Sequence, residues 1–163
     1  MIEVRSEMGK GSTFSVWLPA IEVVQKKAEP VATFGPAVRK GRILVMDDEE
    51  IVRNIAGVMI RSLGHEVEFA ANGEEAIARY QEALLQGRRF DIVILDLTIR
   101  GGMGGEAAIK ILRKLDPDIK AVVSSGYADS SAISEYEALG FGACLAKPYN
   151  MKLLNDTLNR MLN

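Results

Sequence analysis

The feature that most constrains the fold of this chain is the repeated alternation of strand and helix patterns over residues 41–163. Five short segments have strand patterns: residues 43–46, 66–69, 91–96, 121–125 and 143–146. Segments with apolar residues at helical spacing follow them: residues 51–62, 72–84, 106–115, 130–139 and 151–162. Parallel strands require crossover connections, which are usually right-handed and helical. The pattern therefore predicts an α/β fold, a doubly wound parallel sheet of five strands flanked by five helices.

Local signals mark where three of these helices begin or end. Gly64 is placed to cap the end of the first helix, and Asn72 to cap the start of the second. The third helix is expected to stop at Asp116, because Pro117 follows it. The strand and helix units are therefore joined by short connections, as a compact sheet of this kind requires.

Polar residues that can carry chemistry stand at the predicted carboxyl ends of four strands. In chain order they are Asp47 and Asp48, Asp96, Ser125 and Lys147. Doubly wound sheets bind ligands at this edge. Clustered carboxylates repel one another and favour a cation, and Mg²⁺ takes oxygen ligands of this type. A carboxylate can also act as a nucleophile and form an aspartyl phosphate, whose oxygens a lysine can hold.

Each of these residues taken alone also has an ordinary structural interpretation. A run of acidic residues after a strand can cap a helix and complement its dipole, and a single Asp or a Lys-Pro pair can belong to a turn. Their joint placement at the ends of four strands favours one shared site over several unrelated turns.

Four segments resemble the motifs of response-regulator receiver domains of two-component signalling. They are Leu44-Val45-Met46-Asp47-Asp48-Glu49, Ile94-Leu95-Asp96-Leu97-Thr98, Ser124-Ser125-Gly126-Tyr127 and Leu145-Ala146-Lys147-Pro148. The segments occur in the order found in that family, and the resemblance spans residues 42–162. It implies a flavodoxin-like fold with the strand order 2-1-3-4-5.

The resemblance also implies a role for each motif residue. Asp96 is expected to accept a phosphoryl group, and Ser125 and Lys147 are expected to contact that group. Four protein groups are expected to bind Mg²⁺: the carboxylates of Asp47, Asp48 and Asp96 and the backbone carbonyl of Thr98. The peptide bond between Lys147 and Pro148 is expected to be cis, a form that only about 5–6% of X–Pro bonds adopt.

The sequence departs from the family pattern at two places. Cys144 stands where the family usually has an aromatic switch residue, although Tyr127 can place a ring nearby. The loop after Asp96 has Arg100 where proline is common, followed by the glycine-rich residues 101–105. Glycine leaves the backbone unrestrained, so this loop is expected to be mobile. The Arg100 side chain is expected to be solvated or to touch a phosphoryl group or a partner.

The first 40 residues have a different character. Residues 1–19 alternate around a glycine-containing turn and predict a β-hairpin, and residues 20–40 predict a linker before a receiver domain at 41–163. The hairpin sequence resembles the end of a histidine-kinase ATP-binding domain. Its Gly9-Lys10-Gly11-Ser12 turn lacks the spacing of a phosphate-binding P-loop. The resemblance implies that the chain is the C-terminal part of a hybrid sensor histidine kinase.

Composition excludes several other classes of protein. The net charge of −2 offers no basic surface for nucleic acid. A single cysteine fits a reducing compartment, and there is no apolar run of the roughly 20 residues needed to span a membrane. We therefore expect a cytoplasmic chain without membrane contact. His65 is expected at the surface or at a strand end, and Cys144 as a small core residue.

Two functions from other classes compete with a phosphorylation switch driven by a phosphohistidine donor. One is an interaction module that is never phosphorylated, and the other is a phosphatase with an aspartate nucleophile. Such a phosphatase usually needs a second acid two residues after the nucleophile, where this chain has Thr98. The partners expected for the switch are a histidine kinase or a histidine phosphotransfer protein, with a homodimer through the last helix as a further possibility.

Overall fold

The computed structural model describes residues 1–17, 39–126 and 136–163. The chain forms two compact units, Met1–Thr33 and Phe34–Asn163. The fold therefore consists of an N-terminal β unit and a larger α/β unit, each with its own sheet. In the part of the chain that the structure describes, no helix is long and apolar enough to cross a membrane.

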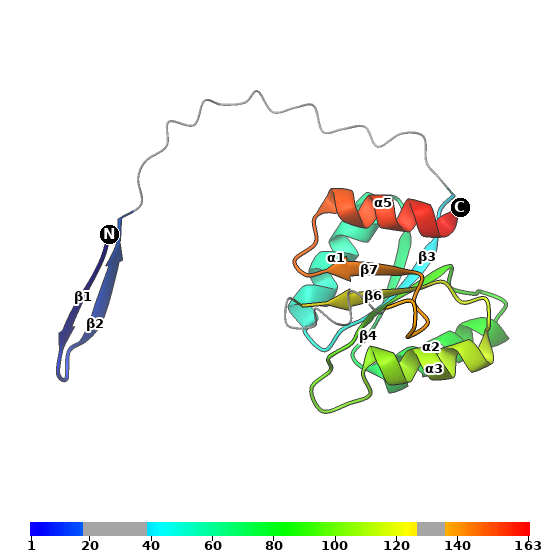
Figure 1. Ribbon diagram of the computed structural model, residues 1–163, viewed down its shortest axis with the longest axis horizontal. Helices are drawn as coiled ribbons and strands as arrows, with labels where there is room; N and C mark the ends of the chain where they lie inside the picture. Colours follow the sequence, from blue (N-terminus) through cyan, green and yellow to red (C-terminus); the bar gives the residue numbers. More distant parts are fainter. Residues whose placement is uncertain (18–38, 127–135) are drawn as a thin grey trace, which may run out of the picture. The chain divides into compact units, whose positions relative to one another are not determined.

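The N-terminal unit contains the predicted hairpin. Strands β1 (Ile2–Glu7) and β2 (Gly11–Val16) pair antiparallel (Figure 1). The register places Ile2 opposite Val16 and Val4 opposite Phe14, so that four apolar side chains share one face of the hairpin. All four are more than half exposed within the chain. An isolated two-stranded hairpin is marginally stable in water, so this face needs a covering partner.

The α/β unit contains a five-stranded parallel sheet in the order β4-β3-β5-β6-β7. Counted within this unit, the order is 2-1-3-4-5, which confirms the predicted fold class. Its strands are β3 (Arg42–Met46), β4 (Glu66–Ala70), β5 (Ile92–Asp96), β6 (Ala121–Ser125) and β7 (Ala143–Ala146). Every residue of β5 and β6 is buried, as continuous apolar strands covered on both faces should be.

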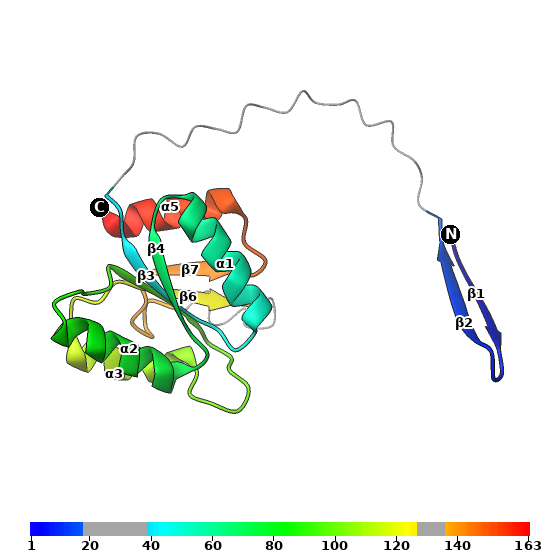
Figure 2. The same ribbon diagram turned by 180° about the vertical axis from the view of Figure 1, so that it is seen from behind.

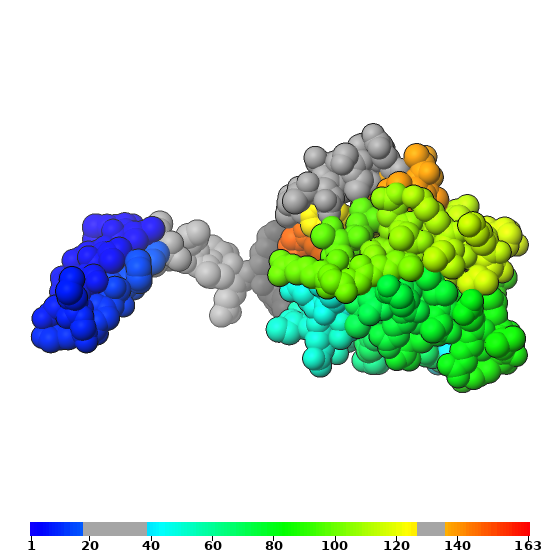
Figure 3. Space-filling model, turned by 90° about the horizontal axis from the view of Figure 1, so that it is seen from below, coloured from blue at the N-terminus to red at the C-terminus, as the bar shows by residue number. Residues whose placement is uncertain are grey.

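Helices cover both faces of this sheet (Figures 1 and 2). Helices α1 (Glu50–Ser62) and α5 (Met151–Leu162) bury one core cluster, and α2 (Gly73–Leu85) and α3 (Gly105–Leu115) bury the other. Figure 3 shows α2 and α3 side by side on the surface of this unit. The described residues contain these four helices. The predicted helix at 130–139 lies mostly outside them, and its described end, residues 136–139, forms a turn.

Several local predictions are confirmed. Asn72 caps α2 by accepting a hydrogen bond from the Glu75 backbone N–H at 2.9 Å. Gly64 follows α1 with a φ of 88°, a conformation that favours glycine, and Asp116 ends α3. The Lys147–Pro148 peptide bond is cis. These helix and strand boundaries bring the polar residues at the strand ends to the positions expected from the sequence.

Candidate functional site

Three carboxylates meet at the carboxyl ends of the neighbouring strands β3 and β5. One ligand oxygen from each of Asp47, Asp48 and Asp96 lies within 4.8 Å of the others. Asp47 and Asp96 are buried, whereas Asp48 is half-buried. We call these three residues and Lys147 the acidic edge.

Among the described residues, Lys147 is the only lysine that forms a salt bridge with these carboxylates. Its Nζ atom donates to Asp47 Oδ2 at 2.6 Å and to Asp96 Oδ2 at 2.8 Å. No salt bridge reaches Asp48 among the residues that the structure describes. Three carboxylates and one ammonium leave a net negative charge in a partly desolvated site. Such a site favours a small cation with oxygen ligands.

For both Asp96 and Lys147, burial and ion pairing shift the pKa in opposite directions. Burial raises the pKa of Asp96, while the Lys147 ammonium partly offsets that rise. Burial would lower the pKa of Lys147, but its hydrogen bonds to Asp47 and Asp96 outweigh burial and raise it. Lys147 therefore stays charged at neutral pH and keeps its hydrogen bonds to Asp47 and Asp96.

The loop after β5 contacts the site through its backbone. The Arg100 backbone N–H donates to Asp48 Oδ2 at 3.2 Å, and the Thr98 N–H donates to Asp96 Oδ1 at 3.4 Å. Thr98 and Arg100 are both exposed. The Arg100 side chain therefore lies at the surface, and its backbone makes the contact with the site.

The glycines of this loop provide close approach as well as backbone freedom. A Cβ atom on Gly104 would lie 2.3 Å from the Leu97 carbonyl oxygen, and one on Gly105 would lie 2.6 Å from the Asp96 carbonyl oxygen. The loop is also bonded to α2, because the Gly73 N–H donates to the Met103 carbonyl at 2.8 Å. These contacts require small residues at Gly104 and Gly105 for packing against β5, whereas the expected mobility of the loop stays a prediction.

Ser125 and Cys144 occupy the side of the site formed by β6 and β7. Ser125 is fully buried at the end of β6, and its hydroxyl donates to the Gly126 carbonyl at 3.3 Å. The Lys147 backbone N–H donates to the Ser125 carbonyl at 2.7 Å, which joins the two strand ends. Cys144 is half-buried, less enclosed than the core position expected for it. Tyr127, the alternative source of a ring near the site, lies outside the described residues.

Sequence reasoning missed Arg53, which also contacts the acidic edge. Its Nη1 atom donates to the backbone carbonyl of Asp47 at 2.5 Å. No local pattern marks this contact, because Arg53 occupies an ordinary helical position that is usually solvated. Only the fold brings its side chain back across the start of α1.

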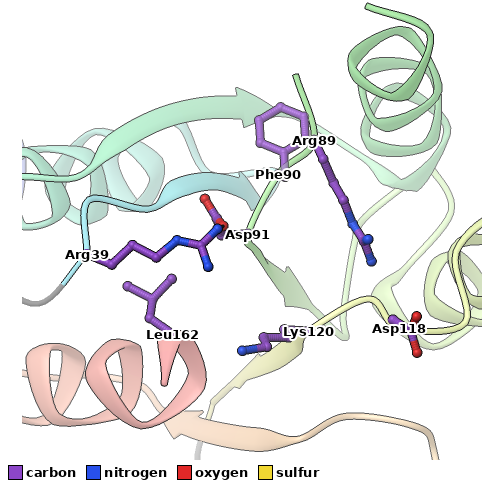
Figure 4. Close-up of a pocket in the computed structure, with 7 residues that line it drawn as sticks. All are labelled: Arg39, Arg89, Phe90, Asp91, Asp118, Lys120 and Leu162. Atoms are coloured by element: carbon purple, nitrogen blue, oxygen red, sulfur yellow. The ribbon is translucent and has the colours of Figure 1, made fainter. Parts of the chain in front are cut away.

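A second group of charged residues lies at the opposite edge of the sheet, where the strands begin. The Tyr80 hydroxyl donates to Asp116 at 2.6 Å, and Arg89 pairs with the same carboxylate. Asp91 accepts from the Arg39 guanidinium at 2.9 Å and from the Arg42 N–H at 2.8 Å. We call these contacts the base network. Figure 4 shows Arg39 and Asp91 next to each other in the lining of a pocket of about 250 Å³.

His65 belongs to the same edge, and its position confirms the strand-end alternative expected for it. It directly precedes β4, as expected for a strand-end residue, but only 7% of it is exposed. Its Nδ1 atom accepts a hydrogen bond from the Gly41 N–H at 3.1 Å. Burial lowers its pKa, although Asp91 opposes that shift. His65 is therefore a neutral structural residue whose hydrogen bond from Gly41 holds the residue that precedes β3.

Comparison with known proteins gives the class of this chain. Residues 43–159 match the response regulator receiver domain family, and the chain belongs to that family. It is therefore a receiver domain of the kind used in two-component systems. The chemotaxis protein CheY of Thermotoga maritima is 31% identical over 121 residues, which cover 74% of this chain and 96% of CheY. The solved structure of CheY4 from Vibrio cholerae has a TM-score of 0.67 at 29% identity and covers 76% of this chain and 100% of CheY4.

Longer relatives match the N-terminal residues as well. The sensor kinase CckA of Brucella abortus is 34% identical over 166 residues, which cover 96% of this chain but 17% of CckA. The sensor histidine kinase AtsR of Burkholderia thailandensis is 30% identical and covers 98% of this chain, which spans 27% of AtsR. The chain thus spans well under a third of the length of these two kinases.

Proposed function

We propose that the chain is the phosphoacceptor of a two-component phosphorelay, with Asp96 taking a phosphoryl group from a phosphohistidine in a Mg²⁺-dependent reaction. The observation that carries this proposal is the acidic edge, where Asp96 lies beside two further carboxylates and one ammonium. Membership of the receiver family supports the same role.

The chemistry follows from the positions of these groups. One oxygen of the Asp96 carboxylate forms a bond to phosphorus while the phosphorus–nitrogen bond of the donor breaks, and the bonding electrons remain on the imidazole nitrogen. Lys147 holds a phosphoryl oxygen, and Ser125 donates to another after its hydroxyl turns from Gly126. Both contacts stabilise charge that grows on the phosphoryl oxygens during transfer.

The donor set suits Mg²⁺, because oxygen ligands converge from Asp47, Asp48 and Asp96. We assign the metal to these carboxylates and to the Thr98 backbone carbonyl. Asp47 already accepts from Lys147 and from the Glu49 N–H at 2.9 Å, so it is suited to hold the metal through water. The bound ion supplies charge neutralisation for the incoming phosphoryl group.

An exposed apolar surface beside the site suits a helical donor protein. Ile51, Ile55 and Val58 recur at helical spacing on α1 and are 74%, 52% and 65% exposed. Ile55 lines an apolar pocket of about 380 Å³ together with Pro148 and Tyr149, next to Lys147. A helix that carries the phosphohistidine can pack here and reach Asp96, as expected for a histidine kinase or a histidine phosphotransfer protein. A homodimer would use a different surface, the outer face of α5, where Leu153 is 43% exposed and lines a pocket with Tyr136 and Cys144.

The N-terminal unit supports a hybrid sensor kinase as the parent protein. We assign residues 1–19 to the last hairpin of an ATP-binding domain, 20–40 to a linker and 41–163 to the receiver domain, in a cytoplasmic protein. The alignment with CckA includes nearly all of this chain, whereas the alignment with CheY covers 74% of it. The exposed apolar face of the hairpin fits a covering domain upstream.

The alternative function is an interaction module that is never phosphorylated. It is favoured by one observation, the presence of Cys144 at the usual position of the aromatic switch residue. The two functions differ in whether a covalent phosphate forms.

The decisive experiment measures the intact mass of the protein after incubation with Mg²⁺ and phosphoramidate. We expect a labile adduct of one phosphate in the wild-type protein, no adduct in Asp96→Asn, and an unchanged adduct in the control Asp91→Asn at the opposite edge. Absence of the adduct from the wild-type protein would support the interaction module instead.

A further inference from the structure

The turn between β3 and α1 carries two of the three carboxylates, and α1 begins there without a side-chain cap. Asp47 and Asp48 end the strand side of this turn, and Glu49 is the N-cap residue of α1. The Glu49 side chain makes no capping hydrogen bond, in contrast to Asn72 and Asn150, which cap α2 and α5. A helix start without a side-chain cap leaves backbone groups to be satisfied in another way.

The Arg53 side chain makes a further contact to this turn from within the helix. It is half-buried and donates from Nη1 to the backbone carbonyl of Asp47, six residues earlier in the chain. The backbone N–H of Arg53 donates to the Glu49 carbonyl at 3.0 Å. Arg53 is therefore hydrogen-bonded to Asp47 on the strand side of the turn and to Glu49 on the helix side. The guanidinium also helps to lower the pKa of Glu75, after the Ala71 N–H and Arg79. Arg53 thus faces the start of α2 as well.

These contacts fix the orientation of Asp47 at three points. Its carbonyl accepts from Arg53, one carboxylate oxygen accepts from the Glu49 N–H, and the other accepts from Lys147. The direction of the adjoining Asp48 carboxylate depends on the same short turn. Partners that orient metal ligands without touching the metal typically change metal affinity by about 10–100-fold when they are removed.

The charge of Arg53 acts against its geometric effect. A cation beside an acidic site repels an incoming metal ion, so electrostatics alone predicts tighter binding when the charge is removed. A bracing role predicts the opposite sign, because a loosened turn no longer holds the carboxylates together. The sign of the change in Mg²⁺ affinity therefore separates the two effects.

We propose that Arg53 is a positioning residue for the Mg²⁺ site, which it stabilises by bracing the Asp47 carbonyl. The inference rests on the proposed function, because it concerns the affinity of the same site for its metal. It adds a residue outside the four receiver motifs to the machinery of the site.

The test is a calorimetric titration of the full chain with Mg²⁺ in wild type, Arg53→Met, Arg53→Lys and Arg61→Met. Arg61→Met removes the same charge from the far end of α1, where Arg61 lies over the Phe69 ring. We expect Arg53→Met to weaken Mg²⁺ binding by about tenfold. Arg53→Lys should lose less, because an ammonium keeps the charge and one donor, and Arg61→Met should bind as wild type does.

A second readout separates positioning from a general loss of stability. The phosphorylation rate of Arg53→Met at saturating Mg²⁺ should return to the wild-type value, with only the half-saturating Mg²⁺ concentration increased. Unchanged or tighter Mg²⁺ binding in Arg53→Met overturns the inference and leaves the proposed function intact.

A further variant keeps the inference testable if Arg53→Met does not fold. Arg53→Gln is uncharged and has a shorter side chain, so it should not span the distance to the Asp47 carbonyl. Weaker Mg²⁺ binding in Arg53→Gln supports the bracing role, and wild-type affinity overturns it. Failure of the wild-type protein to bind Mg²⁺ contradicts the proposed function itself.

Discussion

The two edges of the parallel sheet carry buried carboxylates that are satisfied in different ways. At the base network, Asp116 accepts from Tyr80 and Arg89, and Asp91 accepts from Arg39 and the Arg42 backbone. At the acidic edge, Asp47 and Asp96 share the Lys147 ammonium, and no salt bridge among the described residues reaches Asp48. Donors within the chain match the charges at one edge and leave negative charge at the other. The comparison separates carboxylates paired with cations of the chain from carboxylates that could hold a metal ion.

The largest expected effect comes from removing the one ammonium of the acidic edge. Lys147→Met leaves the buried carboxylates of Asp47 and Asp96 unpaired. Without Mg²⁺, we expect the free energy of unfolding to fall by about 3 kcal/mol. Because a cation can replace the ammonium, added Mg²⁺ should recover more stability in this variant than in wild type.

Urea denaturation with and without Mg²⁺ measures this effect. Lys110→Met is a matched control, because Lys110 pairs with Glu106 on the exposed face of α3 and should contribute less than about 0.5 kcal/mol. If Lys147→Met and Lys110→Met lowered the free energy of unfolding equally, Lys147 would contribute no more than an ordinary surface lysine. That result would contradict the excess negative charge of the acidic edge.

An intermediate effect is expected at the base network. Tyr80→Phe removes the hydroxyl that donates to Asp116 but keeps the ring stacked against Phe90. A lost hydrogen bond to a charged group should lower the free energy of unfolding by about 1.5–2 kcal/mol. The rate of phosphorylation at a temperature where the variant is folded should stay at the wild-type value. A slower rate would mean that the base network also serves the reaction.

The smallest effect concerns the pH dependence of stability through His65. Because burial lowers the pKa of His65 in the folded state, the unfolded chain binds more protons as the pH falls through 6.5. The stability contributed by neutral His65 is therefore complete above pH 6.5 and is lost as the pH falls toward the lower folded pKa. Between pH 7.5 and 5.5 the loss should be less than about 1.4 kcal/mol, the value of one pKa unit.

His65→Asn tests this assignment, because the Asn side-chain oxygen can accept the Gly41 N–H without titrating. Denaturation curves of the variant should show less loss of stability between pH 7.5 and 5.5 than those of wild type. An identical pH dependence in both proteins would assign the effect to other groups.

The sequence predicts most of the fold because its signals are local. The apolar runs of β3, β5 and β6, the Asn72 cap and the stop at Asp116 are each read within a few residues, and the structure has them where expected. The helix expected at 130–139 is the element whose prediction stays largely untested, since residues 127–135 are not described.

The side-chain contacts of the base network and of the acidic edge join residues far apart in the sequence, so no local sequence pattern predicts them. Tyr80 and Asp116 are 36 residues apart, and Lys147 and Asp47 are 100 residues apart. The sequence places Lys147 at the site but does not reveal that it bridges Asp47 and Asp96. Likewise, the small size required of Gly105 depends on the close approach of α3 to the end of β5.

We propose that the excess negative charge of the acidic edge creates a divalent cation site that serves Asp96. The most direct test of this proposal is a crystal of the protein grown with Mn²⁺, whose anomalous scattering locates the ion, since Mn²⁺ accepts the oxygen ligands that suit Mg²⁺. We predict one peak coordinated by the carboxylates of Asp48 and Asp96 and by the Thr98 carbonyl. The absence of a peak there, or a peak at the base network beside Asp91 and Asp118, would contradict it.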